Sequence, residues 1–239
     1  MEARILKLQE LCKERQKKDM PFELMHNQAV EETQDKHRLE NLNRVIRSLP
    51  LRFRGKSFPD YLVQNDGQAT AKKVAERYVS SFADRIKDGT PLQFKGNPGT
   101  GKTFLALIIC QELAKNGYTV KYEPSLDFLK SLLEVRFKSH AAFSSHLSAL
   151  NKIQMLVIDE ITESANKGGA PSELEKQVLF QIINERYQNK LCTLVITNRG
   201  DDELTARLGM PIHDRLCEGG VTVGFNWRSY RQQQGNTHA

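Results

Sequence analysis

The stretch Gly96-Asn97-Pro98-Gly99-Thr100-Gly101-Lys102-Thr103 matches the pattern G-x-x-x-x-G-K-[ST] at every fixed position. It follows an apolar run at Leu92 to Phe94, which predicts a strand, and it precedes an apolar helical stretch, Thr103 to Lys115. Glycines in such a loop let backbone N–H groups curl around phosphate oxygens at a helix N-terminus. Lys102 would neutralise the β and γ phosphates, and the Thr103 hydroxyl would ligate Mg²⁺. This context favours a nucleotide-binding loop over a glycine-rich turn with a chance lysine.

The sequence around this loop alternates short apolar runs with helical spacings. Further strands are expected at Thr119 to Tyr122, Ile153 to Ile158, Thr193 to Ile196 and Val221 to Phe225. Helices are expected from Ala71 to Ile86 with an end at Gly89, from Leu126 to about Phe137, from Glu173 to Tyr187 behind the capping box Ser172 and Glu175, and between Asp202 and Gly209. This alternation predicts an α/β fold with a five-stranded parallel sheet covered by helices on both faces.

Polar side chains follow two of the expected strands. Asp159 and Glu160 end the run Met155 to Ile158, and Asn198 follows Thr193 to Thr197. Asp159 would hold magnesium through water, and Glu160 would orient or deprotonate an attacking water, which favours a hydrolase over a kinase. Asn198 would contact the γ-phosphate or its water, although such an amide on its own is more often a turn residue.

Composition narrows the class of protein. The 239 residues are 39% hydrophobic and 27% charged, which is typical of a globular chain rather than of a disordered or membrane protein. The longest apolar run, Phe104 to Cys110, is too short to span a bilayer, and MEARILKLQE lacks a signal-peptide core, so we expect a cytoplasmic protein. Cys12, Cys110, Cys192 and Cys217 stand too far apart to indicate a zinc site or a disulfide framework. The net charge of +6 suits a nucleic-acid partner but does not require one.

Residues 1–49 form a charge-rich region that we expect to be a helical extension. Helical spacings run from Met1 to about Lys18 and from about Gln28 to Leu49, with a break at Pro21. The sparse apolar positions are Ile5, Leu8, Leu11, Leu39, Leu42, Ile46 and Leu49. So narrow a stripe cannot support a core alone, so these helices either pack back on the main domain or offer the stripe to a partner. We favour the surface for a partner over a merely solvated arm.

Residues 50–68 are expected to form a basic linker before the domain at 69–239. The region holds Phe53 and Phe58 among the cations Arg44, Arg47, Arg52, Arg54 and Lys56, and it is marked by Pro50 and Pro59. Two interpretations stay open. The segment could be a surface for single-stranded nucleic acid, with rings stacking on bases, or a hinge whose aromatic rings dock on the main domain.

Several motifs together resemble the AAA+ ATPases of the initiator and helicase-loader group, and among them the DnaC-type loaders of bacterial replicative helicases. They are GNPGTGKT, LVIDEI, the ITN strand end, LGMPIHDRL and FNWRSYR, within roughly residues 44 to 231. The resemblance implies that ATP or ADP binds with Mg²⁺. It also implies that Arg215 is an arginine finger completing a neighbouring subunit's site, and that Arg231 reaches the nucleotide in its own subunit. Few residues follow Asn198, which implies an abbreviated lid.

The resemblance also implies partners. A helical N-terminal extension, here residues 1–49, would grip a hexameric DnaB-type replicative helicase, while the ATPase domains assemble as a hexameric spiral around single-stranded DNA. Phe137, Lys138 and the loop containing Lys167 stand where the family turns loops toward DNA, although Phe137 could also be ordinary helix core. No membrane partner is expected.

The function expected from this resemblance is that of an ATP-dependent helicase loader, encoded by a bacterium, a phage or a prophage. ATP binding would favour the state that holds DNA, and hydrolysis would release the loader. The nearest rival is an IstB-type transposition helper ATPase that binds duplex DNA. A second rival is a phage adaptor that sequesters the host helicase, and a nucleoside kinase fits least because Glu160 and Asn198 would have no task in it.

Overall fold

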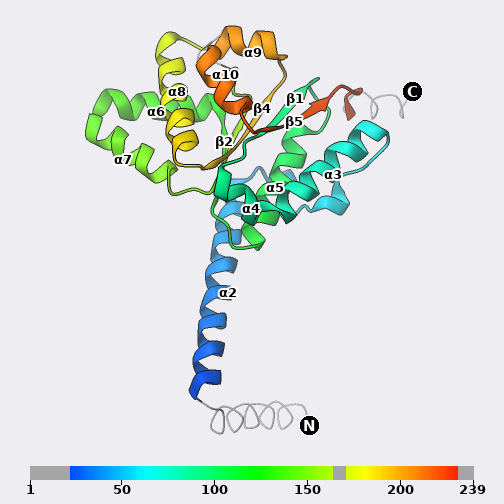
Figure 1. Ribbon diagram of the computed structural model, residues 1–239, viewed down its shortest axis with the longest axis vertical. Coiled ribbons are helices and arrows are strands. Elements are labelled where there is room, and N and C mark those ends of the chain that lie inside the picture. Colours follow the sequence, from blue (N-terminus) through cyan, green and yellow to red (C-terminus); the bar gives the residue numbers. More distant parts are fainter. Residues whose placement is uncertain (1–21, 164–170, 231–239) are drawn as a thin grey trace. The chain divides into compact units, whose positions relative to one another are not determined.

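The computed structural model describes residues 22–163 and 171–230 (Figure 1). Its contacts divide the chain into two compact units, residues 1–40 and 41–239. Helix α2, Phe22–Ser48, runs through the division. The second unit contains every strand described below, and the site is built in it.

A five-stranded sheet forms the centre of the second unit. Its strands are β1 Leu92–Gly96, β2 Val120–Pro124, β3 Met155–Asp159, β4 Cys192–Thr197 and β5 Val221–Phe225. Their spatial order is β2-β3-β4-β1-β5, and every neighbouring pair is parallel. All residues of β3 and β4 are buried, because helices cover both faces of the sheet. The predicted parallel sheet is confirmed.

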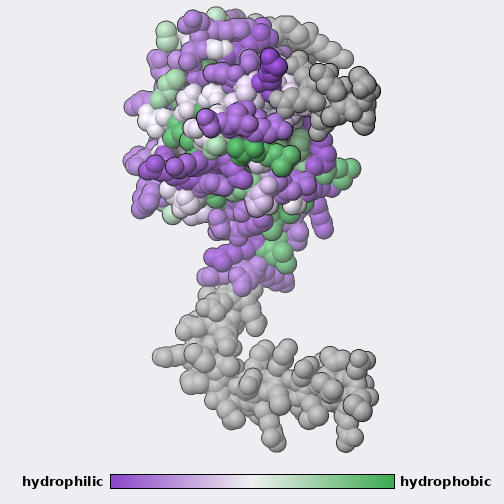
Figure 2. Space-filling model, turned by 90° about the vertical axis from the view of Figure 1, so that its right-hand side faces the viewer, coloured by the Kyte–Doolittle hydropathy of each residue, from purple (hydrophilic) through white to green (hydrophobic). Residues whose placement is uncertain are grey.

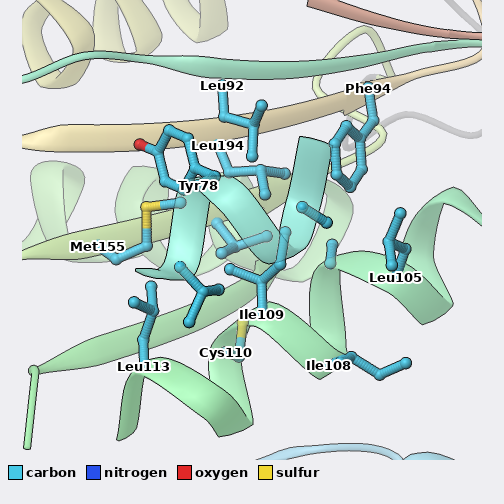
Figure 3. Packing of buried hydrophobic residues seen from close by; sticks show 14 of the residues in the cluster. Tyr78, Leu92, Phe94, Leu105, Ile108, Ile109, Cys110, Leu113, Met155 and Leu194 are labelled. Carbon is cyan, nitrogen blue, oxygen red and sulfur yellow. The ribbon is translucent and has the colours of Figure 1, made fainter. Parts of the chain in front are cut away.

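Helices α3 Asp66–Ser80, α4 Phe82–Asp88 and α5 Lys102–Lys115 cover one face. Their apolar side chains pack with Met155 and Val157 of β3 in one core cluster. Figure 3 shows part of it, with Tyr78 of α3 and Ile109 of α5 close to the strands that carry Leu92 and Leu194.

The other face is covered by α6 Ser125–Lys138, α7 His140–Leu150, α8 Glu173–Gln188, α9 Asp201–Leu208 and α10 Met210–Cys217. Leu156 and Ile158 of β3 point into this second cluster, in the alternation that a strand imposes on successive side chains.

Several local predictions are refined by the structure. The capping box of Ser172 and Glu175 begins α8, and Gly89 ends α4 in the left-handed conformation, both as expected. The single helix expected from Ala71 to Ile86 is two helices, because the chain turns at Ser81, whose hydroxyl donates to the carbonyl of Arg77 at 2.7 Å. Helices α7 and α10 were not predicted. Pro211 is tolerated in α10 because it lies in the first turn.

The last turns of α2 belong to the core of the second unit. Val45 and Leu49 are buried, and Leu42 packs against the first cluster, so this part of the stripe packs back on the main domain. The side-chain amide of Asn41 donates to the carbonyl of Tyr118 at 2.7 Å. Leu39, by contrast, is 58% exposed. The expected domain boundary after residue 49 stays a prediction.

The surface is predominantly polar in the view of Figure 2, where the coloured residues are mostly hydrophilic. Within the described ranges, no helix has the length and apolar character needed to cross a membrane.

Candidate functional site

The octapeptide loop from Gly96 to Thr103 joins β1 to α5, as the sequence predicts. Gly99 has a φ of +75°, and an added Cβ would lie 2.1 Å from Ser229 Oγ. Both the backbone conformation and the lack of space therefore favour glycine at this position. Thr100 is buried, and its hydroxyl donates to the carbonyl of Asn97 at 2.7 Å. Helix α5 begins at Lys102, so the loop lies at a helix N-terminus, where backbone geometry and dipole both favour an anion.

Lys102 is held within the loop. Its ammonium donates to the carbonyl oxygens of Gly96 and Asn97 at 2.7 and 2.6 Å. The residue is buried, and burial lowers the pKa of its ammonium to about 8, because a partly dehydrated cation is destabilised. Such a cation gains more from an anionic neighbour than a solvated lysine would, which suits a role in phosphate binding.

Asp159, at the end of β3, lies beside the first turn of α5. Its Oδ2 accepts hydrogen bonds from the hydroxyls of Thr103 at 3.0 Å and of Tyr122 at 2.8 Å. Its Oδ1 is buried and has no hydrogen-bond partner in the part of the chain that the structure describes. Burial raises the pKa of Asp159, so its carboxylate gains from a nearby cation. A buried carboxylate oxygen without a partner beside a hydroxyl is a donor set that fits Mg²⁺.

Glu160 and Asn198 meet at the ends of β3 and β4. The Asn198 side-chain amide donates to Glu160 Oε1 at 2.5 Å, while Oε2 is buried without a partner among the described residues. Glu160 has a φ of +59°, a strained conformation for a residue with a side chain, and such strain is concentrated at functional sites. Burial and then the charge of Asp159 raise the pKa of Glu160, which makes it a better proton acceptor.

A cavity of about 760 Å³ connects these residues. It is lined by Lys102, Thr103, Asp159, Glu160 and Asn198, so three separate segments of the sequence converge as the strand-end argument predicts. The other wall was not foreseen. It comes from the linker, through Arg52, Phe53, Tyr61 and Leu62, and from Tyr230 near the end of the described chain.

The aromatic rings of the linker pack on the main domain, as one of the two interpretations left open by its sequence expects. Phe53 stacks on Phe104 of α5 with ring centroids 5.5 Å apart, and Phe58 packs against the first core cluster. The Arg54 guanidinium donates to backbone carbonyls of Leu49 and Arg47. Both rings are half-buried against the domain, and a contact of this segment with single-stranded nucleic acid stays a prediction. The prolines and aromatic residues of the linker indicate from the sequence that it could dock on the domain. They do not indicate that it forms a wall of the cavity.

Arg215 lies outside this cavity, on α10. Its Nε donates to Asn184 Oδ1 at 2.8 Å and its Nη1 to the Pro211 carbonyl at 2.7 Å. The guanidinium also lies over the rings of Phe180 and Tyr187, with centroids at 4.9 and 5.7 Å. Arg215 is thus fixed against α8 and does not line the cavity of its own chain. A residue that acts on a neighbouring subunit is expected to lie outside its own cavity. That role stays a prediction.

The remaining predicted site residues fall into two groups. Phe137 is 74% exposed at the end of α6 and Lys138 is exposed beside it, so the alternative of Phe137 as ordinary helix core is wrong. A contact of these two residues with DNA stays a prediction. Lys167 and Arg231 lie outside the residues that the structure describes.

Relatedness to known proteins agrees with this geometry. Residues 2–237 match the model of the family described as IstB-like ATP binding protein. The chain belongs to this family. Within the IstB-like relatives, the replicative helicase loader DnaC of Escherichia coli K12 is 34% identical over 178 residues, which are 74% of this chain and 69% of DnaC. The resemblance to DnaC-type loaders is confirmed.

Solved structures confirm the fold of this IstB-like chain. The crystal structure of the DnaC helicase loader matches with a TM-score of 0.65 and 22% identity, covering 73% of this chain and 98% of that one. The replication initiator DnaA bound to AMPPCP and single-stranded DNA matches with a TM-score of 0.60 and 22% identity, covering 72% of this chain and 50% of that one. The chain therefore has the P-loop AAA+ fold.

Proposed function

We propose that this protein is an ATP-dependent loader that places a hexameric replicative helicase on single-stranded DNA. The observation that carries the proposal is the convergence of Lys102, Asp159 and Glu160 on one cavity, in a chain related to DnaC over most of its length. A binding protein that had lost hydrolysis would not need to retain a buried carboxylate beside the metal-side aspartate.

Four residues of the cavity have tasks in hydrolysis. Lys102 would neutralise the β and γ phosphates of ATP, exchanging its loop carbonyls for phosphate oxygens. Thr103 and Asp159 would hold Mg²⁺, which when bound neutralises charge that develops on the phosphates. Glu160 would accept a proton from the attacking water through Oε2, which has no hydrogen-bond partner among the described residues. ADP would stay bound by the same loop.

Asn198 gives the site a means of sensing the nucleotide. Its amide is bonded to Glu160, so a γ-phosphate that attracts this amide would release Glu160 toward the water. The presence of the γ-phosphate would then control the orientation of Glu160 through the side chain of Asn198. We assign to Arg231 the reading of the nucleotide in its own subunit, and to Arg215 the stabilisation of a neighbour's transferring phosphoryl group.

The partners follow from the proposed role. Residues 1–49 would bind a DnaB-type hexameric helicase, and the ATPase domains would assemble on it as a hexameric spiral. Phe137 and Lys138 offer a solvent-exposed ring and a cation for single-stranded DNA, with Lys167 as a further cation. ATP binding would favour the DNA-holding state, and hydrolysis would release the loader. We place this work in the bacterial cytoplasm, whether the gene belongs to the host, a phage or a prophage.

One alternative has an observation in its favour. The matching family is named for IstB, so a transposition helper that binds duplex DNA is the second candidate. A footprint on duplex DNA in the absence of helicase would support it. A sequestering adaptor, the other alternative, predicts no ATP turnover stimulated by DNA.

The proposal is tested by affinity capture from bacterial lysate with ATP, followed by native mass determination of the captured complex. A ring helicase captured by the wild-type chain, and lost when residues 1–49 are deleted, is the expected result. Capture of a transposase without any helicase would contradict it.

A further inference from the structure

The segment after β5 lies along the phosphate-binding loop, although only Arg231 in this part of the chain has a role expected from the sequence. The backbone N–H of Asn97 donates to the Phe225 carbonyl at 2.9 Å. The indole N–H of Trp227 donates to the Thr100 carbonyl at 3.0 Å, and the backbone N–H of Tyr230 donates to the Gly99 carbonyl at 3.0 Å. Three residues of the loop are thus bonded to three residues of this segment.

These bonds matter because of what a phosphate-binding loop must do. Those of its N–H groups that bind phosphate oxygens cannot also bond to the protein when nucleotide is bound. The carbonyls of the same peptides point elsewhere and need donors of their own. Trp227 and Tyr230 supply donors to two of them, and the Ser229 hydroxyl adds a longer bond of 3.4 Å to the Gly99 carbonyl.

Trp227 is itself fixed from more than one side. Its ring lies 4.9 Å from that of Phe225, centroid to centroid. An added Cβ at Gly67, in the first turn of α3, would lie 2.9 Å from the indole, so helix and ring are in close contact. The Tyr230 hydroxyl donates to the Leu62 carbonyl at 2.6 Å, which joins the segment to the linker wall of the cavity.

We propose that Trp227, Ser229 and Tyr230 form a strap that positions the phosphate-binding loop, with Trp227 as its principal positioning residue. The inference rests on the proposed function to the extent that the loop binds ATP. A strap bonded to loop carbonyls holds the loop's peptide planes, and therefore the direction of its N–H groups, before the nucleotide arrives. Lys102 bonds the carbonyls of Gly96 and Asn97 in the same loop, so a nucleotide that draws Lys102 away would change the loop that the strap holds.

The decisive variant is Trp227→Phe, which removes the indole donor and keeps an aromatic ring. Calorimetry should show ATP bound about fivefold to tenfold more weakly, the loss expected for one hydrogen bond. Tyr230→Phe, which removes the bond to Leu62, should weaken binding by less. Controls are Arg228→Ala, an exposed neighbour outside the cavity lining, and Tyr118→Phe, at the opposite end of the sheet from the loop.

A second readout needs no variant of the strap. Trp227 is the single tryptophan of the chain, so its emission reports on this site alone. Adding MgATP to the wild-type chain should change the intensity or wavelength of that emission along the same isotherm as calorimetric binding, and Lys102→Ala should abolish the change. This readout does not depend on the folding of a strap variant.

The outcomes separate the strap from the proposed function. Weaker binding in Trp227→Phe at an unchanged unfolding temperature, together with a nucleotide-dependent emission change, supports the strap. Unchanged affinity in Trp227→Phe, or silent emission while calorimetry records ATP binding, overturns the strap and leaves the proposed function intact. A wild-type chain that binds no ATP overturns the proposed function itself.

Discussion

The hydroxyl of Tyr122 donates to Asp159 Oδ2 at 2.8 Å, and the same oxygen accepts from the Thr103 hydroxyl at 3.0 Å. Two donors on one oxygen fix the carboxylate plane and leave Oδ1 available for a cation. The acidic group of the proposed metal site is therefore oriented by a residue of β2, a strand in which the sequence shows no motif.

Tyr122→Phe should weaken the response to magnesium and leave metal-free ATP binding unchanged. The carboxylate loses one of its two positioning bonds, so we expect a threefold to tenfold rise in the magnesium concentration that half-saturates ATP turnover. Manganese binding in the presence of ATP, followed by electron paramagnetic resonance, measures the same change without turnover. Tyr118→Phe serves as the control, and equal metal affinity in Tyr122→Phe and wild type would show that the hydroxyl has no positioning role.

Glu160→Gln should keep ATP binding and lose turnover. The amide can still accept the bond from Asn198 but cannot take a proton from water, so single-turnover hydrolysis should fall about a hundredfold or more. The control is Glu163→Gln, which makes the same charge change three positions along the chain. Glu163 lies outside the cavity lining, with its Oε1 4.0 Å from Arg199 Nη2. Wild-type rates in Glu160→Gln would refute the assignment of the base.

The sequence predicts the sheet well because its signals are local. Met155 to Ile158 and Thr193 to Ile196 are continuous apolar runs, and a buried parallel strand is the structure in which such runs are stable. The break at Ser81 was missed because the apolar spacing continues through it from Tyr78 to Phe82, while the competing hydroxyl bond is a three-dimensional detail. Helix α10 was missed because Pro211 suggests an end, whereas it occupies a first turn.

Some residues of the candidate site could likewise be predicted from the sequence, and others could not. Lys102, Asp159 and Asn198 could be placed from the sequence because the carboxyl ends of parallel strands share one edge of the sheet. Tyr61 and Tyr230 could not be placed on the cavity, because each lies far along the chain from the loop and reaches it through tertiary packing alone. Cavity walls built by packing leave no spacing pattern in the sequence.

A truncation series should separate the extension from the ATPase. Deleting residues 1–40 should leave ATP affinity intact and abolish helicase binding, because the second compact unit begins at Asn41. Deleting 1–49 should also remove the buried side chains of Val45 and Leu49, at a cost of about 3 kcal/mol or more in the free energy of unfolding. Thermal unfolding and co-elution with helicase measure both effects. Helicase binding that survives the shorter deletion would place the grip elsewhere.

Arg215→Ala should bind ATP normally and lose the turnover gained on assembly. A finger acting on a neighbour is worth about a thousandfold in rate where it has been measured, and it contributes little to ground-state binding. Mixing Arg215→Ala with Lys102→Ala should partly restore turnover, because an intact Arg215 then faces an intact loop. If mixed assemblies form and stay inactive, Arg215 does not act across the interface, and Arg207 becomes the residue to test.

The central claim is that this chain uses ATP to place a ring helicase on single-stranded DNA. Its most direct test is the number of helicase hexamers retained on closed circular single-stranded DNA, counted by quantitative sedimentation with and without the chain and ATP. A closed circle has no end over which a ring can thread, so retention reports loading. We predict retention that requires both the chain and ATP and is lost with Lys102→Ala. Equal retention with and without the chain, or with wild type and Lys102→Ala, would contradict the account.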